Sequence, residues 1–434
     1  MAAGGRVSVD DRSVCVPRRA PGLPPDVGAV IAQAHETAGG APNSGALPSP
    51  ANRIRVLHFI ANSQPLEYFR LLVRFTDWSR FDVYVGSLDR SGRLQEGLHE
   101  LGVRTLALGA VRRTQYLAAT LRLAWWLRHN QIDVVQVHLL EASLVGLTAA
   151  RLAGVPLTIF TGHHSHEVPL HKRRLLLEVD RLAARPLCDH VIAPSMEMKE
   201  TFTRVYGCSR DKVEVIYHGL DLERLNPVIA DGSRFRAEYG LEGRLVLGAI
   251  SRYFWVKNLE ALVRAFAMIA SEVPNAMLVI VGGGGDPTGL ASLVRSLDLS
   301  DRVLLLPPRT DIADVLAAFD LFVHPALAES FGLAVLEAMA LARPVVTTPV
   351  GIAREVVEDR VSGLVARGKD PESLRRAIAE MLAARERWPE IGTEARRRAL
   401  AFTPEKWVWT HEQRYTDWLE ASSRRNRRLP HLRP

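Results

Sequence analysis

The stretch HPALAESFGLAVLEAMALARPVV, residues 324–346, places one glutamate in a strand-to-helix turn and another inside the helix that follows. The preceding segment, Asp320–His324, is mostly apolar and predicts a strand. Gly332–Leu341 then predicts an apolar helix, which ends before a proline. Glu329 is therefore expected in the turn, and Glu337 about a turn and a half inside the helix.

The start of this predicted helix is suited to an anionic ligand. The backbone N–H groups of Phe331, Gly332 and Leu333 lack partners within the helix and point out of its N-terminus, where phosphate binds readily. At a rise of roughly 1.5 Å per residue, the two carboxylates lie on the order of 10 Å apart, which suits the two ends of a sugar nucleotide. An ionised carboxylate can accept hydrogen bonds from two neighbouring sugar hydroxyls. The alternative is a core helix with a solvated glutamate at each end.

The composition indicates a soluble globular protein with more than one domain. The chain has 434 residues, of which 47% are hydrophobic and 24% are charged. No stretch approaches the roughly 18 apolar residues that span a bilayer, and no secretory signal pattern is visible. Three scattered cysteines fit a reducing cytoplasm better than a disulfide framework. The net charge of +7 fits an anionic ligand or membrane surface and is too diffuse to indicate nucleic acid.

From Arg53 onward, short apolar runs alternate with amphipathic helical stretches. Such alternation predicts βαβ units, with parallel sheets covered on both faces. The polar stretch Leu220–Gly243 is interpreted as a linker, because the alternation restarts after it. Two doubly wound halves joined by a hinge imply a cleft at the carboxyl ends of both sheets. The predicted organisation is a disordered extension (1–52), a first domain (53–224), a second domain (225–403), a helix (404–421) that packs back on the first domain, and a basic tail (422–434).

The individual elements follow from the same pattern. Leu259–Ala270 is expected to be a helix, with Asn258 as its N-cap residue. Strands are expected at Val56–Ile60, Phe81–Val85, Val103–Leu106, Val134–Val137, Leu157–Thr161, His190–Ala193, Val213–Tyr217, Val246–Ile250, Leu278–Val281, Val303–Leu306, Leu321–Val323 and Val345–Thr347.

Five landmarks follow one another between residues 213 and 365. They are VEVIYHGLDLERLNP (213–227), GAISRYFWVKN (248–258), LVIVGGGG (278–285), the paired glutamates, and PVVTTPVGIAREVV (344–357) with VSGLV (361–365). In this order and combination, the chain resembles the retaining glycosyltransferases of family 4. That resemblance implies the α/β fold called GT-B, in which two Rossmann-like domains face each other across a cleft.

The resemblance also implies roles for the residues of the donor site. Arg252 and Lys257 bind the diphosphate, Glu337 holds the ribose hydroxyls, and Glu329 faces the transferred sugar. Cationic groups and helix N–H groups can stabilise a departing nucleoside diphosphate without a metal, and the chain contains no Asp-x-Asp pair that would hold one. No cofactor is expected besides the sugar nucleotide itself. The remaining donor-binding groups are expected to be Gly283, in the glycine-rich strand end, and the amides of Phe331, Gly332 and Leu333.

The first half is expected to carry the acceptor side and one further catalytic group. Members of the family often have a Thr-x-His after a strand, with the histidine over the sugar, and residues 161–163 read Thr-Gly-His. His163 fits that role, and the adjacent His164 could take it instead. No cluster of Cys, Asp or Glu completes a metal site around these histidines. The loop 61–65 lacks the paired glycines of many members, which indicates an altered acceptor side.

Two basic stretches suggest contact with an anionic membrane surface. One is His171–Arg174, and the other is amphipathic and carries Arg112, Arg113, Leu117, Leu121, Trp125 and Trp126. In the family, such faces often hold the enzyme against the inner leaflet, near lipid-linked acceptors. The alternative is a solvated helix face above a buried apolar stripe.

The sequence therefore predicts a metal-independent, retaining glycosyltransferase of the hexosyltransferase type. It would move a sugar from a nucleoside-diphosphate donor to a hydroxyl of a glycan or a lipid-linked acceptor, as in polysaccharide biosynthesis. The expected location is the cytoplasm, peripheral to the inner membrane leaflet. The alternatives are a non-catalytic GT-B partner or adaptor, or another GT-B enzyme such as a sugar-nucleotide epimerase. The complete set of Arg252, Lys257, Glu329 and Glu337 favours the transferase.

Overall fold

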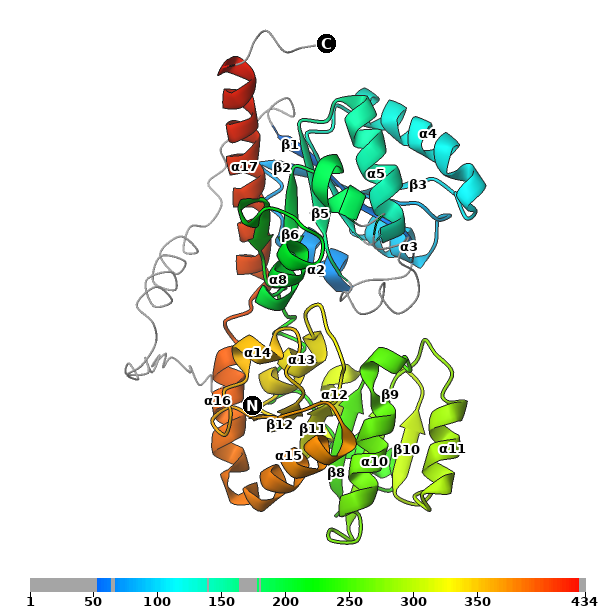
Figure 1. Cartoon of the computed structure of the whole chain (residues 1–434), viewed down its shortest axis with the longest axis vertical. Helices are drawn as coiled ribbons and strands as arrows, with labels where there is room; N and C mark the ends of the chain where they lie inside the picture. The colour runs from blue at the N-terminus through cyan, green and yellow to red at the C-terminus, as the bar shows by residue number, and fades with distance from the viewer. Residues whose placement is uncertain (1–52, 64–66, 139, 164–177, 179–180, 429–434) are drawn as a thin grey trace, which may run out of the picture. The chain divides into compact units, whose positions relative to one another are not determined.

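The computed structural model describes residues 53–63, 67–138, 140–163, 178 and 181–428. The predicted disordered extension, His164 and the basic stretch His171–Arg174 lie outside these residues. Within the described part, the strands form two separate parallel sheets flanked by helices (Figure 1). No helix in that part is both long enough and apolar enough to cross a membrane.

The first sheet has the strand order β3-β2-β1-β4-β5-β6-β7, and every neighbouring pair is parallel. Its strands are β1 (Ile54–Ile60), β2 (Phe81–Ser87), β3 (Arg104–Ala107), β4 (Val134–His138), β5 (Leu157–Thr161), β6 (His190–Ala193) and β7 (Val213–Val215). The helices of this part are α2 (Glu67–Phe75), α3 (Arg93–Glu100), α4 (Tyr116–His129), α5 (Leu140–Ala153) and α8 (Met196–Arg204).

The second sheet has the order β10-β9-β8-β11-β12-β13 and is also parallel throughout. Its strands are β8 (Leu245–Ile250), β9 (Ala276–Val281), β10 (Val303–Leu306), β11 (Leu321–His324), β12 (Val345–Thr347) and β13 (Leu364–Val365). Its helices are α9 (Ser233–Tyr239), α10 (Leu259–Ile269), α11 (Thr288–Ser296), α12 (Ile312–Ala317), α13 (Leu333–Ala340), α14 (Ala353–Val356), α15 (Pro371–Ala383) and α16 (Trp388–Ala399). The last helix, α17, is Pro404–Arg428.

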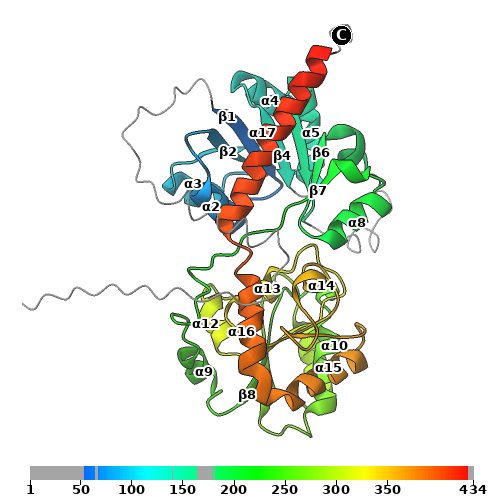
Figure 2. The same ribbon diagram turned by 90° about the vertical axis from the view of Figure 1, so that its left-hand side faces the viewer.

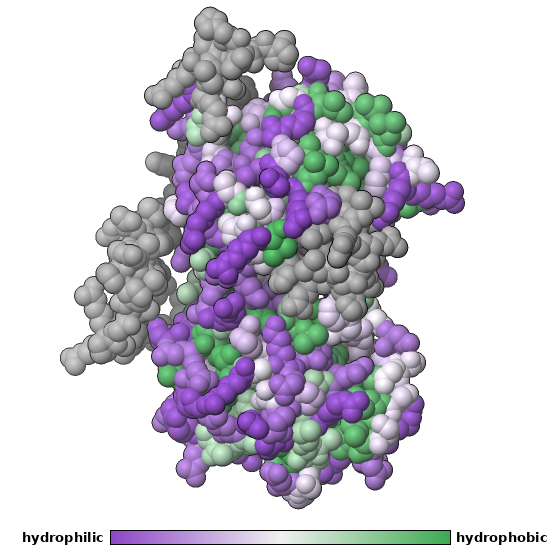
Figure 3. Space-filling model, in the orientation of Figure 1, coloured by the Kyte–Doolittle hydropathy of each residue, from purple (hydrophilic) through white to green (hydrophobic). Residues whose placement is uncertain are grey.

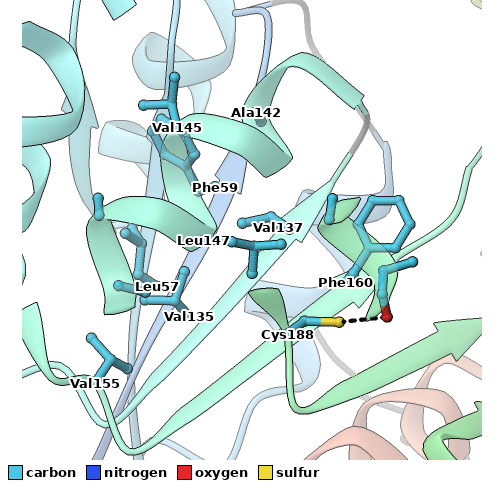
Figure 4. Close-up of a cluster of buried hydrophobic side chains, with 14 of the residues drawn as sticks. Leu57, Phe59, Val135, Val137, Ala142, Val145, Leu147, Val155, Phe160 and Cys188 are labelled. Carbon is cyan, nitrogen blue, oxygen red and sulfur yellow. Dashed lines mark hydrogen bonds between the residues drawn. The ribbon is translucent and has the colours of Figure 1, made fainter. Parts of the chain in front are cut away.

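The two faces of the first sheet bury different cores because side chains alternate along each strand. Leu57 and Phe59 of β1 join one core with Val135 and Val137 of β4, next to α5 (Figure 4). The opposite face buries Val56 and Ile60 of β1 with residues of α2 and α17. Figures 1 and 2 both show α17 lying against this sheet. The first part of α17 therefore packs in the core in which β1 lies.

Every strand predicted from the sequence is present, with ends that differ by at most two residues. The interpretation of Leu220–Gly243 as a plain linker was wrong, because α9 lies within it and buries Phe235 against Phe319. The predicted end of the last helix at Ala421 was also wrong. The helix continues to Arg428.

Candidate functional site

The loop between β11 and α13 takes its shape from two glycines. Gly332 has a φ of +98°, a conformation that residues with a side chain rarely adopt. A Cβ on Gly351 would overlap the carbonyl oxygen of Phe331 and crowd the side chain of Glu329. The amide of Ile352 also donates to the Phe331 carbonyl at 2.7 Å. The chain around Gly351 therefore packs against the turn that carries Glu329 and holds this turn in place.

Glu329 forms a buried ionic cluster with Lys257 and His324. Its Oε1 accepts a hydrogen bond from the Lys257 ammonium and lies 3.0 Å from Nε2 of His324. The Lys257 and Glu329 side chains are only 17% and 13% exposed. Burial alone would raise the pKa of Glu329, but the hydrogen bond and charge of His324, followed by those of Lys257, lower it to about 2. This carboxylate is therefore ionised before any ligand binds.

Asn258 holds Lys257 in place beside Glu329. Lys257 ends a short 3-10 helix, Trp255–Lys257, and Asn258 follows it with a φ of +55°. Asn258 is the N-cap residue of α10, as predicted, but its side chain makes no capping hydrogen bond there. Its amide instead donates to the carbonyls of Pro325 and Lys369, at 3.0 and 2.7 Å. Asn258 thereby ties the lysine loop to the carboxyl end of β11.

The glycine-rich segment after β9 is explained by close packing. A Cβ on Gly282 or on Gly285 would overlap the carbonyl oxygens of Ser251 and Tyr253 respectively. The carbonyl of Gly283 accepts a hydrogen bond from the amide of Tyr253 at 3.1 Å. The glycines thus let this loop lie directly against the loop of Arg252, and a contact of Gly283 with a donor stays a prediction.

Arg252 differs from Lys257 in its surroundings. Its side chain is exposed, and the guanidinium carbon lies 4.9 Å from the ring centre of Phe254. No carboxylate in the described part of the chain forms an ion pair with it. Arg252 is therefore not in the Lys257–Glu329 cluster, and its guanidinium remains available to an anion in solution.

Glu337 is partly buried on α13, so it is not the solvated glutamate of the core-helix alternative. Burial raises its pKa to about 7, while the positive charge of Arg224 opposes the rise and the negative charge of Glu67 adds to it. At neutral pH this carboxyl is therefore protonated in a large fraction of molecules. The two glutamates therefore differ in their protonation at neutral pH.

Anion binding at the start of α13 stays a prediction. The amides of Phe331, Gly332 and Leu333 have no backbone acceptor among the described residues outside the helix itself. Their position next to Glu329 follows from the chain itself, since the turn leads directly into the helix.

His163 is linked to the Glu329 turn through Ser330. The Ser330 hydroxyl donates to the carbonyl of His163 at 2.8 Å, and the Ser330 carbonyl accepts from the Ser195 hydroxyl at 2.7 Å. Nε2 of His163 lies 2.8 Å from Nδ1 of His138, at the end of β4. Hydrogen bonds thus connect the backbone of His163 to the turn that carries Glu329, and Glu329 to Lys257.

The sequence reasoning did not identify His324, Ser330 or His138 as site residues. A signal was present for the two histidines, because each is the last residue of a parallel strand and such strands end at the ligand-binding edge of a sheet. Ser330 was identifiable only by its place between Glu329 and Phe331.

Two family models match this chain, one on each half. Residues 68–224 match the model described as Glycosyltransferase Family 4, and residues 232–398 match that of Glycosyl transferases group 1. The chain belongs to glycosyltransferase family 4.

Curated relatives of this family 4 chain include two D-inositol 3-phosphate glycosyltransferases. The protein from Rhodococcus erythropolis is 31% identical over 299 residues, which are 64% of this chain and 65% of that protein. The protein from Salinispora tropica is 29% identical over 347 residues, 72% of this chain and 71% of that protein. The match thus covers slightly less than two thirds of the Rhodococcus protein.

Solved structures show that the fold is GT-B. HepE from Anabaena, in complex with UDP and glucose, superposes with a TM-score of 0.73 at 22% identity, over 84% of this chain and 100% of that chain. Sucrose-phosphate synthase from Thermosynechococcus elongatus gives a TM-score of 0.72 at 20% identity, over 85% of this chain and 100% of that chain. The predicted fold of two Rossmann-like domains is thereby confirmed.

Proposed function

We propose that this protein transfers a sugar from a nucleoside-diphosphate donor to a hydroxyl acceptor, with retention of the anomeric configuration. The observation that carries the proposal is the ionic cluster of Glu329, Lys257 and His324 at the start of α13. In this cluster, ionised Glu329 is an acceptor for sugar hydroxyls. Lys257 supplies a cation for phosphate, and the nearby amides at the start of α13 supply N–H donors.

The proposed division of labour follows the charges in the site. Lys257, Arg252 and the amides of residues 331–333 would stabilise the negative charge that builds up on the departing diphosphate, without need of a metal. Glu329 would accept hydrogen bonds from the transferred sugar. Glu337 would bind the two ribose hydroxyls, and His163 would lie over the sugar.

Retention is proposed to occur by attack on the face that the diphosphate leaves. In that scheme, the acceptor oxygen bonds to the anomeric carbon while the bond to the phosphate oxygen breaks. The proton of the acceptor hydroxyl passes to the departing phosphate. The salt-bridged, deeply ionised state of Glu329 supports a positioning and electrostatic role for this carboxylate rather than that of a proton donor.

A nucleotide-release assay tests this assignment. UDP-glucose is the first donor to test, since HepE was solved with UDP and glucose, and GDP-, ADP- and CMP-linked sugars complete the panel. The wild type should release the nucleotide, and Lys257→Met and Glu329→Gln should lose nearly all release. Arg376→Met is the matched control, because that side chain is 72% exposed on α15. Equal release by Lys257→Met and the wild type would remove Lys257 from the site.

A membrane-facing acceptor side is also proposed, from the surface of α4. Leu117, Leu121 and Trp125 are 74%, 57% and 67% exposed, and they lie one turn apart on one stripe of the helix. A separate stripe of α4, with Ala119, Leu123 and Leu127, faces the core. Hydrophobic side chains gather in this region of the surface in Figure 3.

Two exposed arginines, Arg112 and Arg113, precede this helix. Each basic residue near an anionic surface adds about 1 kcal/mol to binding, so the apolar stripe and the arginines fit an anionic lipid surface together. The chain should sediment with anionic vesicles and not with neutral ones, and Leu121→Glu should abolish this. Equal sedimentation of the Leu121→Glu variant would exclude α4 as the contact.

A further inference from the structure

The start of α8 contacts the turn that carries Glu329. Ser195 precedes α8 as its N-cap residue and is fully buried. A hydroxyl has one proton to donate and lone pairs to accept with. The Ser195 oxygen accepts from the amide of Met198 at 3.2 Å, and its proton is donated to the carbonyl of Ser330 at 2.7 Å. One hydroxyl therefore caps α8 and also holds the residue that follows Glu329.

The second residue of α8, Glu197, contacts the backbone on another side of the same turn. Its Oε2 accepts a hydrogen bond from the amide of Gly351. Gly351 is buried against the turn, since a Cβ on it would lie 2.9 Å from the Cβ of Glu329. A buried amide needs an acceptor, and Glu197 supplies one. The carboxylate of Glu197 therefore holds the backbone against which the Glu329 side chain packs.

A third contact pairs the first amide of α8. The first four N–H groups of a helix have no acceptor within that helix. The amide of Met196 donates to Oε1 of Glu355, on α14, at 2.8 Å. The other oxygen of Glu355 accepts from the hydroxyl of Tyr217 at 2.6 Å. Both oxygens of this carboxylate therefore bind residues of the half that carries the first sheet.

The contacts are reciprocal between the two halves of the chain. Glu355 belongs to the half with the second sheet and accepts from an amide of α8. Glu197 belongs to the half with the first sheet and accepts from an amide before α14. Each half thus supplies a carboxylate for an amide of the other, and these bonds fix the start of α8 relative to the turn.

The groups assigned to the nucleotide are different residues. The contacts of α8 are made to Ser330, Gly351 and Glu355, which lie around or after the turn. The proposed function gives the diphosphate to Arg252 and the ribose to Glu337. Loss of the α8 contacts should therefore disturb the sugar end of the donor and leave nucleotide binding intact.

We propose that the start of α8 and Glu355 are positioning elements that hold the Glu329 carboxylate against the transferred sugar. Ser195 fixes the peptide that follows Glu329, and Glu197 fixes the backbone that packs against its side chain. Glu355 keeps the start of α8 in place for both contacts. The half that carries the first sheet thereby sets one end of a donor site built on the second sheet. The contact of Glu329 with the sugar rests on the proposed function.

Hydrogen exchange of single backbone amides, measured on the full chain without donor, tests the contacts. The amide of Gly351 should exchange about tenfold faster in Glu197→Ala than in the wild type, as expected for one lost hydrogen bond. Glu197→Gln retains a side-chain oxygen that can accept, so it should keep most of the protection. Equal exchange of this amide in Glu197→Ala and the wild type overturns the proposal, whatever the activity of the protein.

Steady-state kinetics with the donor that the wild type uses tests the positioning role. In Glu197→Ala, kcat should fall about tenfold, while inhibition by the free nucleoside diphosphate should stay within about twofold of the wild type. Glu197→Gln should recover most of kcat. A loss of nucleotide binding as large as the loss of kcat would indicate a general structural defect and overturn the proposal. An unchanged kcat despite fast exchange at Gly351 overturns it as well.

Two further variants complete the design. Glu355→Ala removes the acceptor of the Met196 amide and serves if Glu197→Ala does not fold. It should speed the exchange of that amide and lower kcat with nucleotide binding unchanged, and an unchanged kcat overturns the proposal. Glu200→Ala is the matched control, because Glu200 is exposed on the same helix and loses the same charge. Absence of donor turnover in the wild type would contradict the proposed function alone, since the exchange rates still decide whether α8 holds the turn.

Discussion

Replacing Glu337 with glutamine should stabilise the protein at alkaline pH while it removes donor binding. The pKa of this carboxyl is about 7, against an ordinary value of 4.5. Between these two pH values the folded chain keeps a proton that the unfolded chain has released, so stability falls as the pH rises through this window. Above pH 7, the whole penalty for an ionised Glu337 is present, and a glutamine does not incur it.

The size of the effect follows from the pKa difference. At about 1.36 kcal/mol per pKa unit, the penalty at pH 8 is roughly 3 kcal/mol, an upper value because glutamine must also be buried. Glu337→Gln should therefore gain about 1–3 kcal/mol in the free energy of unfolding at pH 8 and much less at pH 5. The gain should appear as a rise of several degrees in Tm at pH 8.

The assay is thermal unfolding of both proteins at pH 5 and pH 8, with and without donor. Glu372→Gln is the control, because Glu372 is exposed and its arginine neighbours lower its pKa to about 2. It should show no gain at pH 8. The donor should raise the Tm of the wild type and not that of Glu337→Gln. An equal change in Tm at both pH values would refute the buried, proton-carrying state of Glu337.

Three further predictions concern the same candidate site. Binding of a sugar nucleotide should release a fraction of a proton at pH 7, because the ribose diol requires ionised Glu337. Calorimetry in buffers of different ionisation heat measures this release, and its absence would contradict the role of Glu337. Lys257→Met should lower the free energy of unfolding, measured in denaturant, by about 2–4 kcal/mol, because Glu329 stays buried without its cation. Adding Glu329→Gln should restore most of this loss. A double variant as unstable as Lys257→Met would refute the importance of this ion pair. Gly351→Ala should abolish nucleotide release and lower Tm, because its Cβ meets the Phe331 carbonyl, whereas Gly289→Ala, with open space around it, should do neither.

The sequence predicted the strands well for a physical reason. Parallel strands buried on both faces form continuous apolar runs, as in Leu157–Thr161, and flanking polar residues mark their ends. The helix α9 was missed because its seven residues carry little apolar periodicity, and Phe235 is its one fully buried side chain. Short polar helices held by one aromatic side chain are not visible in a sequence pattern.

The sequence selected candidate site residues, but it did not indicate which of them contact one another. The motifs selected Lys257 and Glu329, but their ion pair joins residues 72 positions apart, and no local pattern reports such a contact. The role of Asn258 shows the same limit. Its sequence position indicates a helix cap, whereas its amide hydrogen bonds are made to distant loops.

The two glutamates show how one helix start can give the same side chain two opposite states. Glu329 lies between a lysine and a histidine and is ionised down to about pH 2, whereas Glu337 is partly buried on α13 and holds its proton up to about pH 7. Environments that push two pKa values apart assign different tasks to chemically equal groups. A carboxylate that never changes its charge suits the reacting end of a donor, where the negative charge must be constant through the reaction. One that titrates near neutral pH suits the binding end, so pH should govern donor affinity at Glu337 and leave the step at Glu329 unaffected between pH 6 and 8.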